Sequence, residues 1–162
     1  MKYLSLQCQS LKSEINQLIS EKRLEQIYYF ARQSYPNECC GLILKQGIRP
    51  CKNIQNELHQ SDPVNYPRSA QEGFVFSPKD ALFLSRNIDS ENPVKVIYHS
   101  HPDVGAYFSN EDKKNALFDG EPIYPVDYLV IDIQKEAVIC CKLFRFIAGD
   151  YQLIAVLPGQ II

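Results

Sequence analysis

Two histidines and an aspartate lie close together in the middle of the chain. His99 and His101 end a run of mainly β-branched and aromatic residues that begins at Val94, and Asp112 opens a helix-compatible segment. Because side chains two residues apart in a strand share a face, the two imidazoles would converge on one point. Two ring nitrogens, one carboxylate and a vacant fourth position are the ligand set of a catalytic rather than a structural zinc site.

Each part of this pattern also has an ordinary explanation. A His-x-His pair on a strand more often packs or faces solvent than binds a metal, and Ser109-x-x-Asp112 also spells a capping box at a helix start. The combination favours the metal site, because Pro102 ends the strand directly after the histidines and a carboxylate, Glu38, leads an apolar strand upstream.

The combined pattern resembles the JAMM motif of the MPN/JAB metalloprotease family. The likeness extends from about Ile15 to the last predicted strand, and the block from Tyr35 to Leu42 looks like that of the compact bacterial members. The chain matches the motif without a gap or substitution at Glu38, the run His99-Ser100-His101-Pro102, Ser109 and Asp112.

The resemblance implies one zinc ion per chain, held by neutral His99, neutral His101 and ionised Asp112, with a zinc-bound water as the nucleophile. Glu38 would take the proton of this water and deliver it to the leaving amine as general acid and base. Ser109 would hydrogen-bond the oxyanion of the tetrahedral intermediate. Zinc is inferred from the ligand types, and other divalent ions could occupy the same ligands.

The resemblance also implies a substrate class. Relatives with this motif cut after the C-terminal Gly-Gly tail of a ubiquitin-like or sulfur-carrier protein, often beside an enzyme that activates the same tail. We therefore predict a zinc-dependent peptidase or isopeptidase, with the substrate tail paired to an exposed sheet edge. Tyr107, in the rim between the ligands, would offer an exposed aromatic ring to the substrate chain.

Three other functions remain open from the sequence. A non-catalytic MPN-type scaffold would keep the fold without turnover, but it has no physical need for a vacant metal position. A RadC-like DNA-associated protein shares a similar histidine motif, but the chain has no basic run. A phage-tail accessory that cuts cell wall has the same fold, and only a substrate assay would separate it from the first prediction.

Composition describes an ordinary globular chain. At 162 residues and 45% hydrophobic residues, it is long enough for one domain with its own core. Its 17 basic and 19 acidic residues nearly balance, so the sequence predicts neither a nucleic-acid nor an anionic-membrane partner. No stretch is apolar enough to cross a bilayer and the first residues are too polar for a signal peptide, so we expect a cytoplasmic protein.

The cysteines favour a reducing compartment. Cys39-Cys40 and Cys140-Cys141 are adjacent pairs, and neighbours in a strand face opposite ways, so neither pair readily closes a disulfide or chelates one metal. There is no C-x-x-C motif, and we expect buried thiols that act as small hydrophobic side chains. Cys8 and Cys51 receive no role.

The pattern of elements predicts a single mixed α/β domain of α+β type, with a central mixed sheet flanked by a few helices. Residues 15–162 would form this domain, and residues 1–14 an N-terminal extension or an extra strand. An apolar stripe predicts a helix after Ser20, and Ser77-Pro78 predicts a second helix start. The predicted strands cover residues 15–19, 38–44, 48–54 at an edge, 74–76, 94–101, 128–133, 137–146 and 151–157.

Several polar residues receive predictions of a different kind. The segment 55–73 reads as a long polar surface loop, which could act as a lid, with His59 at the surface in it. Ser100 would point away from the histidine face and serve the structure. Asp127 and Asp132 are predicted to be solvated strand residues with no role in the site.

Overall fold

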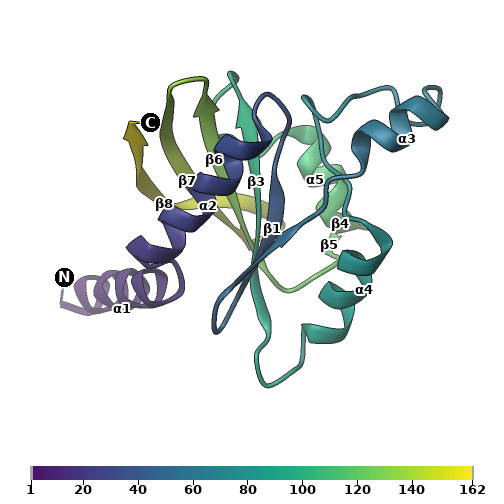
Figure 1. The fold of residues 1–162 in the computed structure, drawn as a ribbon. Helices are drawn as coiled ribbons and strands as arrows, with labels where there is room; N and C mark the ends of the chain where they lie inside the picture. The colour runs from purple at the N-terminus through teal and green to yellow at the C-terminus, as the bar shows by residue number, and fades with distance from the viewer. Residues whose placement is uncertain (1, 162) are drawn as a thin grey trace.

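The computed structural model describes residues 2–161, with side chains from residue 9 onward. Its centre is a six-stranded sheet in the order β2-β1-β3-β6-β7-β8, in which only β3 and β6 run parallel (Figure 1). The predicted mixed sheet is therefore confirmed. The strands are β1 (Cys40–Leu44), β2 (Ile48–Cys51), β3 (Val94–Pro102), β6 (Asp127–Gln134), β7 (Ala137–Ile147) and β8 (Asp150–Ile161).

Helices cover both faces of this sheet (Figure 1). One face packs on α1 (Lys2–Leu18) and α2 (Glu21–Ser34), and the other faces α4 (Pro78–Asn87) and α5 (Asn110–Ala116). The short helix α3 (Gln55–Ser61) and a small hairpin, β4 (Leu117–Phe118) with β5 (Glu121–Pro122), complete the second side. Each face of the sheet has its own apolar cluster, so β1, β3 and β6 are apolar on both faces.

Helix α2 forms where the sequence predicts it. Its apolar residues recur at i, i+3, i+4 and i+7, and this stripe is buried against the sheet. Ser20 occupies the N-cap position, although its side chain makes no capping bond. The buried stripe consists of Leu24, Ile27, Tyr28 and Ala31.

The predicted strands in the N-terminal segment are wrong. The chain forms helix α1 through Leu18, so neither an extra strand near the N-terminus nor a strand at 15–19 exists. A short apolar run cannot distinguish a strand from a helix, and here Leu11, Ile15 and Leu18 follow helical spacing and pack on the sheet.

The segment 55–73 is not a bare loop, because it contains α3. This helix was missed because only Gln55 of its seven residues is buried, so no apolar stripe marks it. The predicted strand at 74–76 is reduced to one bridge between Asn53 and Phe76. Strand β2 does lie at the sheet edge, as Pro50 predicted.

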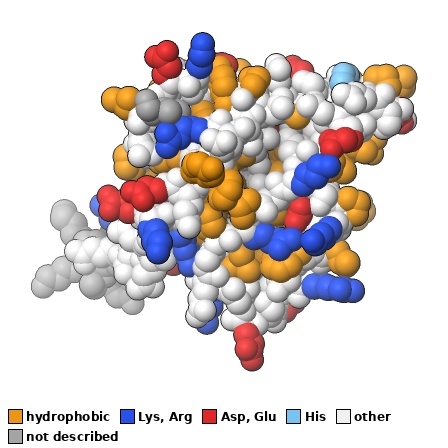
Figure 2. All heavy atoms as spheres, viewed as in Figure 1, with side chains coloured by type: hydrophobic (Ala, Val, Ile, Leu, Met, Phe, Trp, Pro, Cys, Tyr) orange, Lys and Arg blue, Asp and Glu red, His pale blue; other side chains and the backbone are white. Residues whose placement is uncertain are grey.

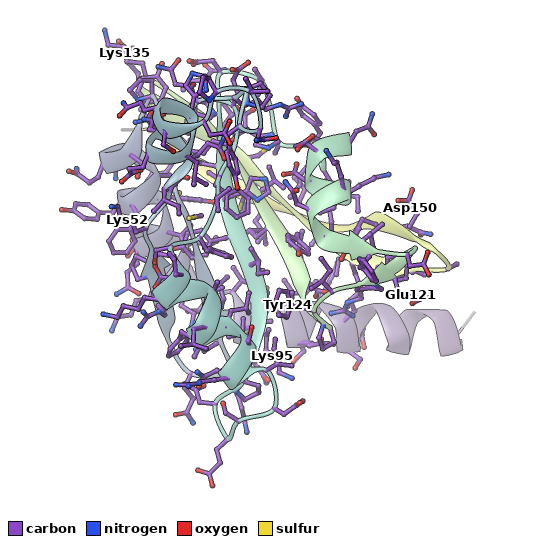
Figure 3. The ribbon with its side chains drawn as sticks, turned by 90° about the vertical axis from the view of Figure 1, so that its right-hand side faces the viewer. Lys52, Lys95, Glu121, Tyr124, Lys135 and Asp150 are labelled. Carbon is purple, nitrogen blue, oxygen red and sulfur yellow. The ribbon has the colours of Figure 1, made fainter. Side chains whose placement is uncertain are left out.

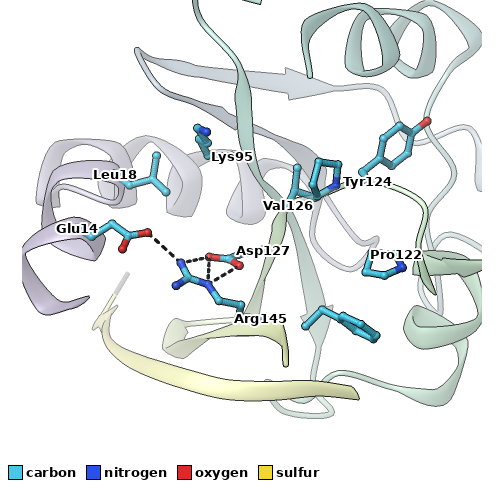
Figure 4. A pocket seen from close by; sticks show the side chains of 10 residues that line it. Glu14, Leu18, Lys95, Pro122, Tyr124, Val126, Asp127 and Arg145 are labelled. Atoms are coloured by element: carbon cyan, nitrogen blue, oxygen red, sulfur yellow. Dashed lines mark hydrogen bonds and ion pairs between the residues drawn. The ribbon is translucent and has the colours of Figure 1, made fainter. Parts of the chain in front are cut away.

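Asp127 and Asp132 are buried rather than solvated, which corrects a second prediction. Asp127 starts β6 and receives three hydrogen bonds of 2.8–3.2 Å from the Arg145 guanidinium, which also reaches Glu14 of α1 at 3.0 Å (Figure 4). Asp132 lies in register with His101 on the neighbouring strand. Burial raises the pKa of both aspartates.

The described cysteines agree with the predicted thiols. Cys39, Cys40 and Cys141 are buried, Cys51 and Cys140 are half-buried, and all five are free; the side chain of Cys8 lies outside the described residues. Among the helices described, none is long and apolar enough to cross a membrane. The face in Figure 2 shows basic and acidic side chains interspersed, without a broad patch of one sign.

Candidate metal centre

Three predicted ligands meet at one end of β3. His99 Nε2 lies 3.1 Å from Asp112 Oδ1, and His101 Nε2 lies 3.5 Å from Asp112 Oδ2. The two Nε2 atoms are 3.1 Å apart, and the ligand atoms of the three residues all lie within 4.8 Å of one another. This is the only such group of three or more His, Cys, Asp or Glu residues in the part of the chain that the structure describes.

The sheet register explains why the histidines converge. Strand β3 continues through Pro102, so His99 and His101 share a face, and Ser100 between them points the other way. The Ser100 hydroxyl accepts a hydrogen bond from the Cys39 amide at 2.8 Å, and the Ser100 amide donates to the Cys39 carbonyl at 3.1 Å. Ser100 therefore ties β1 to β3, and its predicted structural role is confirmed.

The tautomer of His101 and the neutral form of His99 suit a metal ligand set. His101 Nδ1 lies 3.1 Å from the Gly105 carbonyl, which can only accept, so a neutral ring places its lone pair on Nε2. Burial lowers the pKa of His99, which keeps that ring neutral. Its Nδ1 is buried without a hydrogen-bond partner among the described residues, and the ring stacks on Phe74 at 4.8 Å between centroids.

Asp112 is fixed by the start of α5. Ser109 and Asp112 form a capping box: the Asp112 amide donates to Ser109 Oγ at 3.0 Å, and the Ser109 amide donates to Asp112 Oδ2 at 2.8 Å. Burial opposes ionisation of Asp112, but His99, His101 and Ser109 outweigh it and hold its pKa below the ordinary value. The carboxylate is therefore ionised and held in place, as a ligand requires.

Glu38 lies two residues before β1. Cys40 pairs with His99, so the same antiparallel register continued by two residues sets Glu38 opposite His101. Its amide donates to the Ala70 carbonyl at 2.7 Å. Its side chain is 6% exposed, lines a cavity together with Asn53 and Ala70, and has no side-chain hydrogen-bond partner among the described residues. Burial, together with the charge of Asp112, raises its pKa to about 9, against a smaller opposing effect of Arg68.

The surroundings contain contacts that the sequence did not reveal. Phe74 and Asp132 border the histidines, but Phe74 has no sequence signal, and Asp132 is placed only by the β3–β6 register. Tyr107 is half-exposed and meets the His101 ring edge to face at 5.0 Å, so it does lie at the rim. His59, in α3, bonds the Tyr66 carbonyl and is not among the converging ligands.

A sequence profile of the prokaryotic homologs of the JAB domain matches residues 20–141. The chain belongs to this prokaryotic JAB family. The family includes metal-dependent isopeptidases, and many of its members are non-catalytic. The resemblance drawn from the motif is therefore confirmed at the level of family and fold.

Two solved structures share the prokaryotic JAB fold of this chain. The solution structure of protein DSY2949 from Desulfitobacterium hafniense is 24% identical, with a TM-score of 0.58, and the match covers 83% of this chain and 86% of that one. A solution structure from Salinibacter ruber is 16% identical, with a TM-score of 0.53, covering 86% and 89%. A search of curated proteins found no match.

Proposed function

We propose that this protein is a zinc-dependent peptidase or isopeptidase that cuts after the C-terminal Gly-Gly tail of a ubiquitin-like or sulfur-carrier protein. The observation that carries the proposal is the convergence of His99, His101 and Asp112 within 4.8 Å, with Glu38 buried and unpartnered beside them. Burying carboxyl groups without a salt bridge costs stability, and a scaffold gains nothing in return.

The donor set fits zinc, because neutral imidazoles and one carboxylate are preferred zinc ligands and three protein ligands leave a position open. When bound, the ion would act as a Lewis acid that lowers the pKa of water and polarises the scissile carbonyl. His99, His101 and Asp112 would hold it. Their hydrogen bonds to Gly105 and Ser109 orient two of these ligands.

Glu38 would move the proton. Its ionised carboxylate would accept a proton from the attacking water and then deliver it to the nitrogen of the leaving amine, which balances the hydrolysis. A pKa raised to about 9 in the metal-free protein means that burial favours the protonated form, and a nearby cation would draw this value down towards neutrality.

Ser109 would contribute a hydrogen bond to the oxyanion. Its hydroxyl lies 2.6 Å from Asp112 Oδ2, so it must turn from this carboxylate to reach a substrate oxygen. The Ser109 amide still bonds the same carboxylate at 2.8 Å, so the ligand keeps its position when the hydroxyl turns. Capping and oxyanion binding are thus compatible in one residue.

A free backbone edge beside the site supports an extended substrate tail. The segment 74–76 bonds to residues 52–54 on one side, through the Ile54 amide with the Val75 carbonyl and the Ser77 amide with the Lys52 carbonyl. The backbone groups of Phe74 and Phe76 make no hydrogen bond to any described residue. Because the Phe74 ring stacks on His99, a peptide paired to this edge would run beside the ligands.

The proposal includes a cellular setting. We place the protein in the cytoplasm, beside an enzyme that activates the same carrier tail, and without a nucleic-acid or membrane partner. The near balance of 17 basic and 19 acidic residues supports the last point.

The deciding experiment is incubation of the zinc-loaded protein with ubiquitin-like proteins extended past Gly-Gly, followed by mass spectrometry. We expect a product that ends at the second glycine with wild type, and about a hundredfold or more less of it with Glu38→Gln, which keeps the ligands. The proposal fails if the zinc-loaded wild type leaves all these proteins intact, and the role of Glu38 fails if the Glu38→Gln protein cuts equally fast.

A further inference from the structure

An apolar cavity of about 260 Å³ opens beside Asp112. Asp112 is the only charged residue in its lining, among the residues that the structure describes. The inner wall comes from three elements of the core: Leu84 of α4, Ile97 of β3 and Ala116 of α5. Tyr124 and Tyr128 line it as well, and Phe74 and Phe76 form another side.

The wall residues give the cavity a fixed shape. Leu84, Ile97 and Ala116 are each at most 2% exposed and belong to the apolar cluster on this face of the sheet. Core side chains are held by close packing, so the cavity exists before a ligand arrives, as small-molecule and side-chain sites usually do. A mobile surface groove would not offer this.

The cavity is also continuous with the free backbone edge. Phe74 and Phe76 point to the same side, with ring centroids 5.4 Å apart, and both rings line the cavity. Alternate side chains of an extended peptide project to one side. A peptide that pairs with this edge would therefore present every second side chain towards the cavity.

We propose that this cavity is a side-chain subsite that selects one large apolar residue, of leucine or phenylalanine size, within a few positions of the bond that is cut. The inference rests on the proposed function and deepens it, because two glycines have no side chain with which to fill a cavity. It makes the sequence next to the Gly-Gly pair a second determinant of specificity.

The lining favours an apolar side chain over a charged one, because most of it is apolar and its uncharged polar groups are the Asn115 amide and the Tyr124 and Tyr128 hydroxyls. Among the described residues, the lining contains no Lys or Arg that could pair with a carboxylate, and burying an unpaired carboxylate among apolar side chains is costly; the Tyr124 hydroxyl already lies 3.2 Å from Ser85 Oγ. An alanine would leave most of the volume to water. An added apolar group in such a pocket typically raises kcat/KM by about tenfold or more.

The proposal is tested by a substitution on α4 that fills the cavity with a larger side chain. Ala81→Leu adds a larger side chain from a half-buried lining position on a helix that carries no ligand, and leucine is a good helix former. The matched control is Lys79→Leu, which adds an apolar side chain at an exposed position of the same helix. Zinc content and thermal unfolding of both variants show that they fold and keep the site.

The first measurement is kcat/KM on Gly-Gly peptides with leucine, phenylalanine, alanine or aspartate scanned along the positions around the scissile bond. We expect one position at which leucine or phenylalanine exceeds alanine about tenfold or more. This ratio should fall to about one in Ala81→Leu and persist in Lys79→Leu. Cleavage without such a position, or an unchanged ratio in Ala81→Leu, overturns the subsite and leaves the proposed activity intact.

The second measurement needs no turnover. Methyl NMR of the zinc-loaded protein is recorded with N-acetyl-leucine amide and with N-acetyl-alanine amide as probes. We expect the leucine probe to shift the methyl signals of Leu84, Ile97 and Ala116, the alanine probe to leave them, and Ala81→Leu to abolish the shifts. These shifts without peptide cleavage would retain the subsite and reject the peptidase, and their absence would reject the subsite.

Discussion

The two ends of the parallel strands β3 and β6 bury carboxyl groups in opposite ways. Figure 3 labels Lys95 near the start of β3 and Lys135 in the turn after β6, at opposite ends of the sheet. At the Lys95 end, Asp127 receives three hydrogen bonds from Arg145 (Figure 4). At the Lys135 end, Glu38 is buried with no hydrogen-bond partner for its carboxyl group among the described residues.

The difference separates a structural charge from one available for chemistry. A planar guanidinium pairs with both oxygens of Asp127, so the charge of this carboxylate is already balanced by the protein. Asp112 faces two imidazoles that can bind a cation but do not neutralise it when unprotonated. At the Asp127 end of the strands the buried negative charge is balanced by the protein. At the Asp112 end it is not, and a divalent ion would supply the missing positive charge.

Removing one of the predicted metal ligands should have the largest effect on the site. His101→Ala deletes one of the three predicted metal ligands. Mutating a residue that only hydrogen-bonds a ligand typically lowers metal affinity 10–100-fold, so we expect the loss of His101 to lower zinc affinity by more than that. Metal analysis of the purified protein measures this, with His59→Ala as a control that keeps about one zinc per chain. A wild type without zinc, purified without chelator, would contradict the metal site.

Glu38→Gln tests the unpartnered carboxyl group itself. The amide has nearly the same shape but cannot exchange a proton, so we expect cleavage to fall by about 10²–10⁴-fold with zinc retained. Glu57→Gln, at an exposed glutamate paired with Lys52, should change neither quantity. Steady-state kinetics and metal analysis of the same samples decide the point, and retained turnover would remove Glu38 from the mechanism.

Ser109→Ala sharpens the distinction between capping and catalysis. It removes the hydroxyl that caps α5 and that we assign to the oxyanion, so we expect kcat to fall about a hundredfold while KM stays close to the wild-type value. A cap alone would lower thermal stability, by about 1 kcal/mol, and leave kcat unchanged. Kinetics together with thermal unfolding therefore separate the two roles.

The sequence predicted the three converging ligands better than it predicted the helices and buried residues around them. His99, His101 and Asp112 converge because strand alternation and a capping box are local rules that the sequence spells out. Helix α1 was missed because the run Ile15–Ile19 allows two periods, and its burial depends on a sheet formed far along the chain.

Long-range register accounts for the other errors. Asp127 and Asp132 looked solvated because a lone acidic residue in a strand usually is, but their burial depends on Arg145 and on the pairing of β3 with β6. The stacking of Phe74 on His99 likewise follows from packing that no local spacing encodes. Tertiary structure decides such positions.

Removing the ion pair between Arg145 and Asp127 should lower stability and leave the predicted metal site unchanged. Arg145→Ala leaves Asp127 buried without its partner, so we expect the free energy of unfolding to fall by about 2 kcal/mol. Zinc content should not change, because the pair lies at the other end of β3 and β6 from the histidines. Chemical denaturation and metal analysis test this, and a loss of zinc would show that the two ends are coupled.

The last contrast concerns the pH dependence of the stability of the metal-free protein. The pKa of Glu38 is raised from 4.5 to about 9, so the folded state binds more protons than the unfolded state between these values. Its contribution is therefore fully present below pH 4.5 and is lost as pH rises towards 9, with a slope of at most about 1.4 kcal/mol per pH unit. Glu38→Gln should flatten the decline and leave a residual slope from Asp127 and Asp132, whose pKa values burial also raises. Denaturation midpoints of both proteins, measured across this pH range with a chelator present, test this prediction. Equal slopes of stability against pH in the two proteins would mean that the Glu38 carboxyl group is solvated. The contrast between the two ends of β3 and β6 would then disappear.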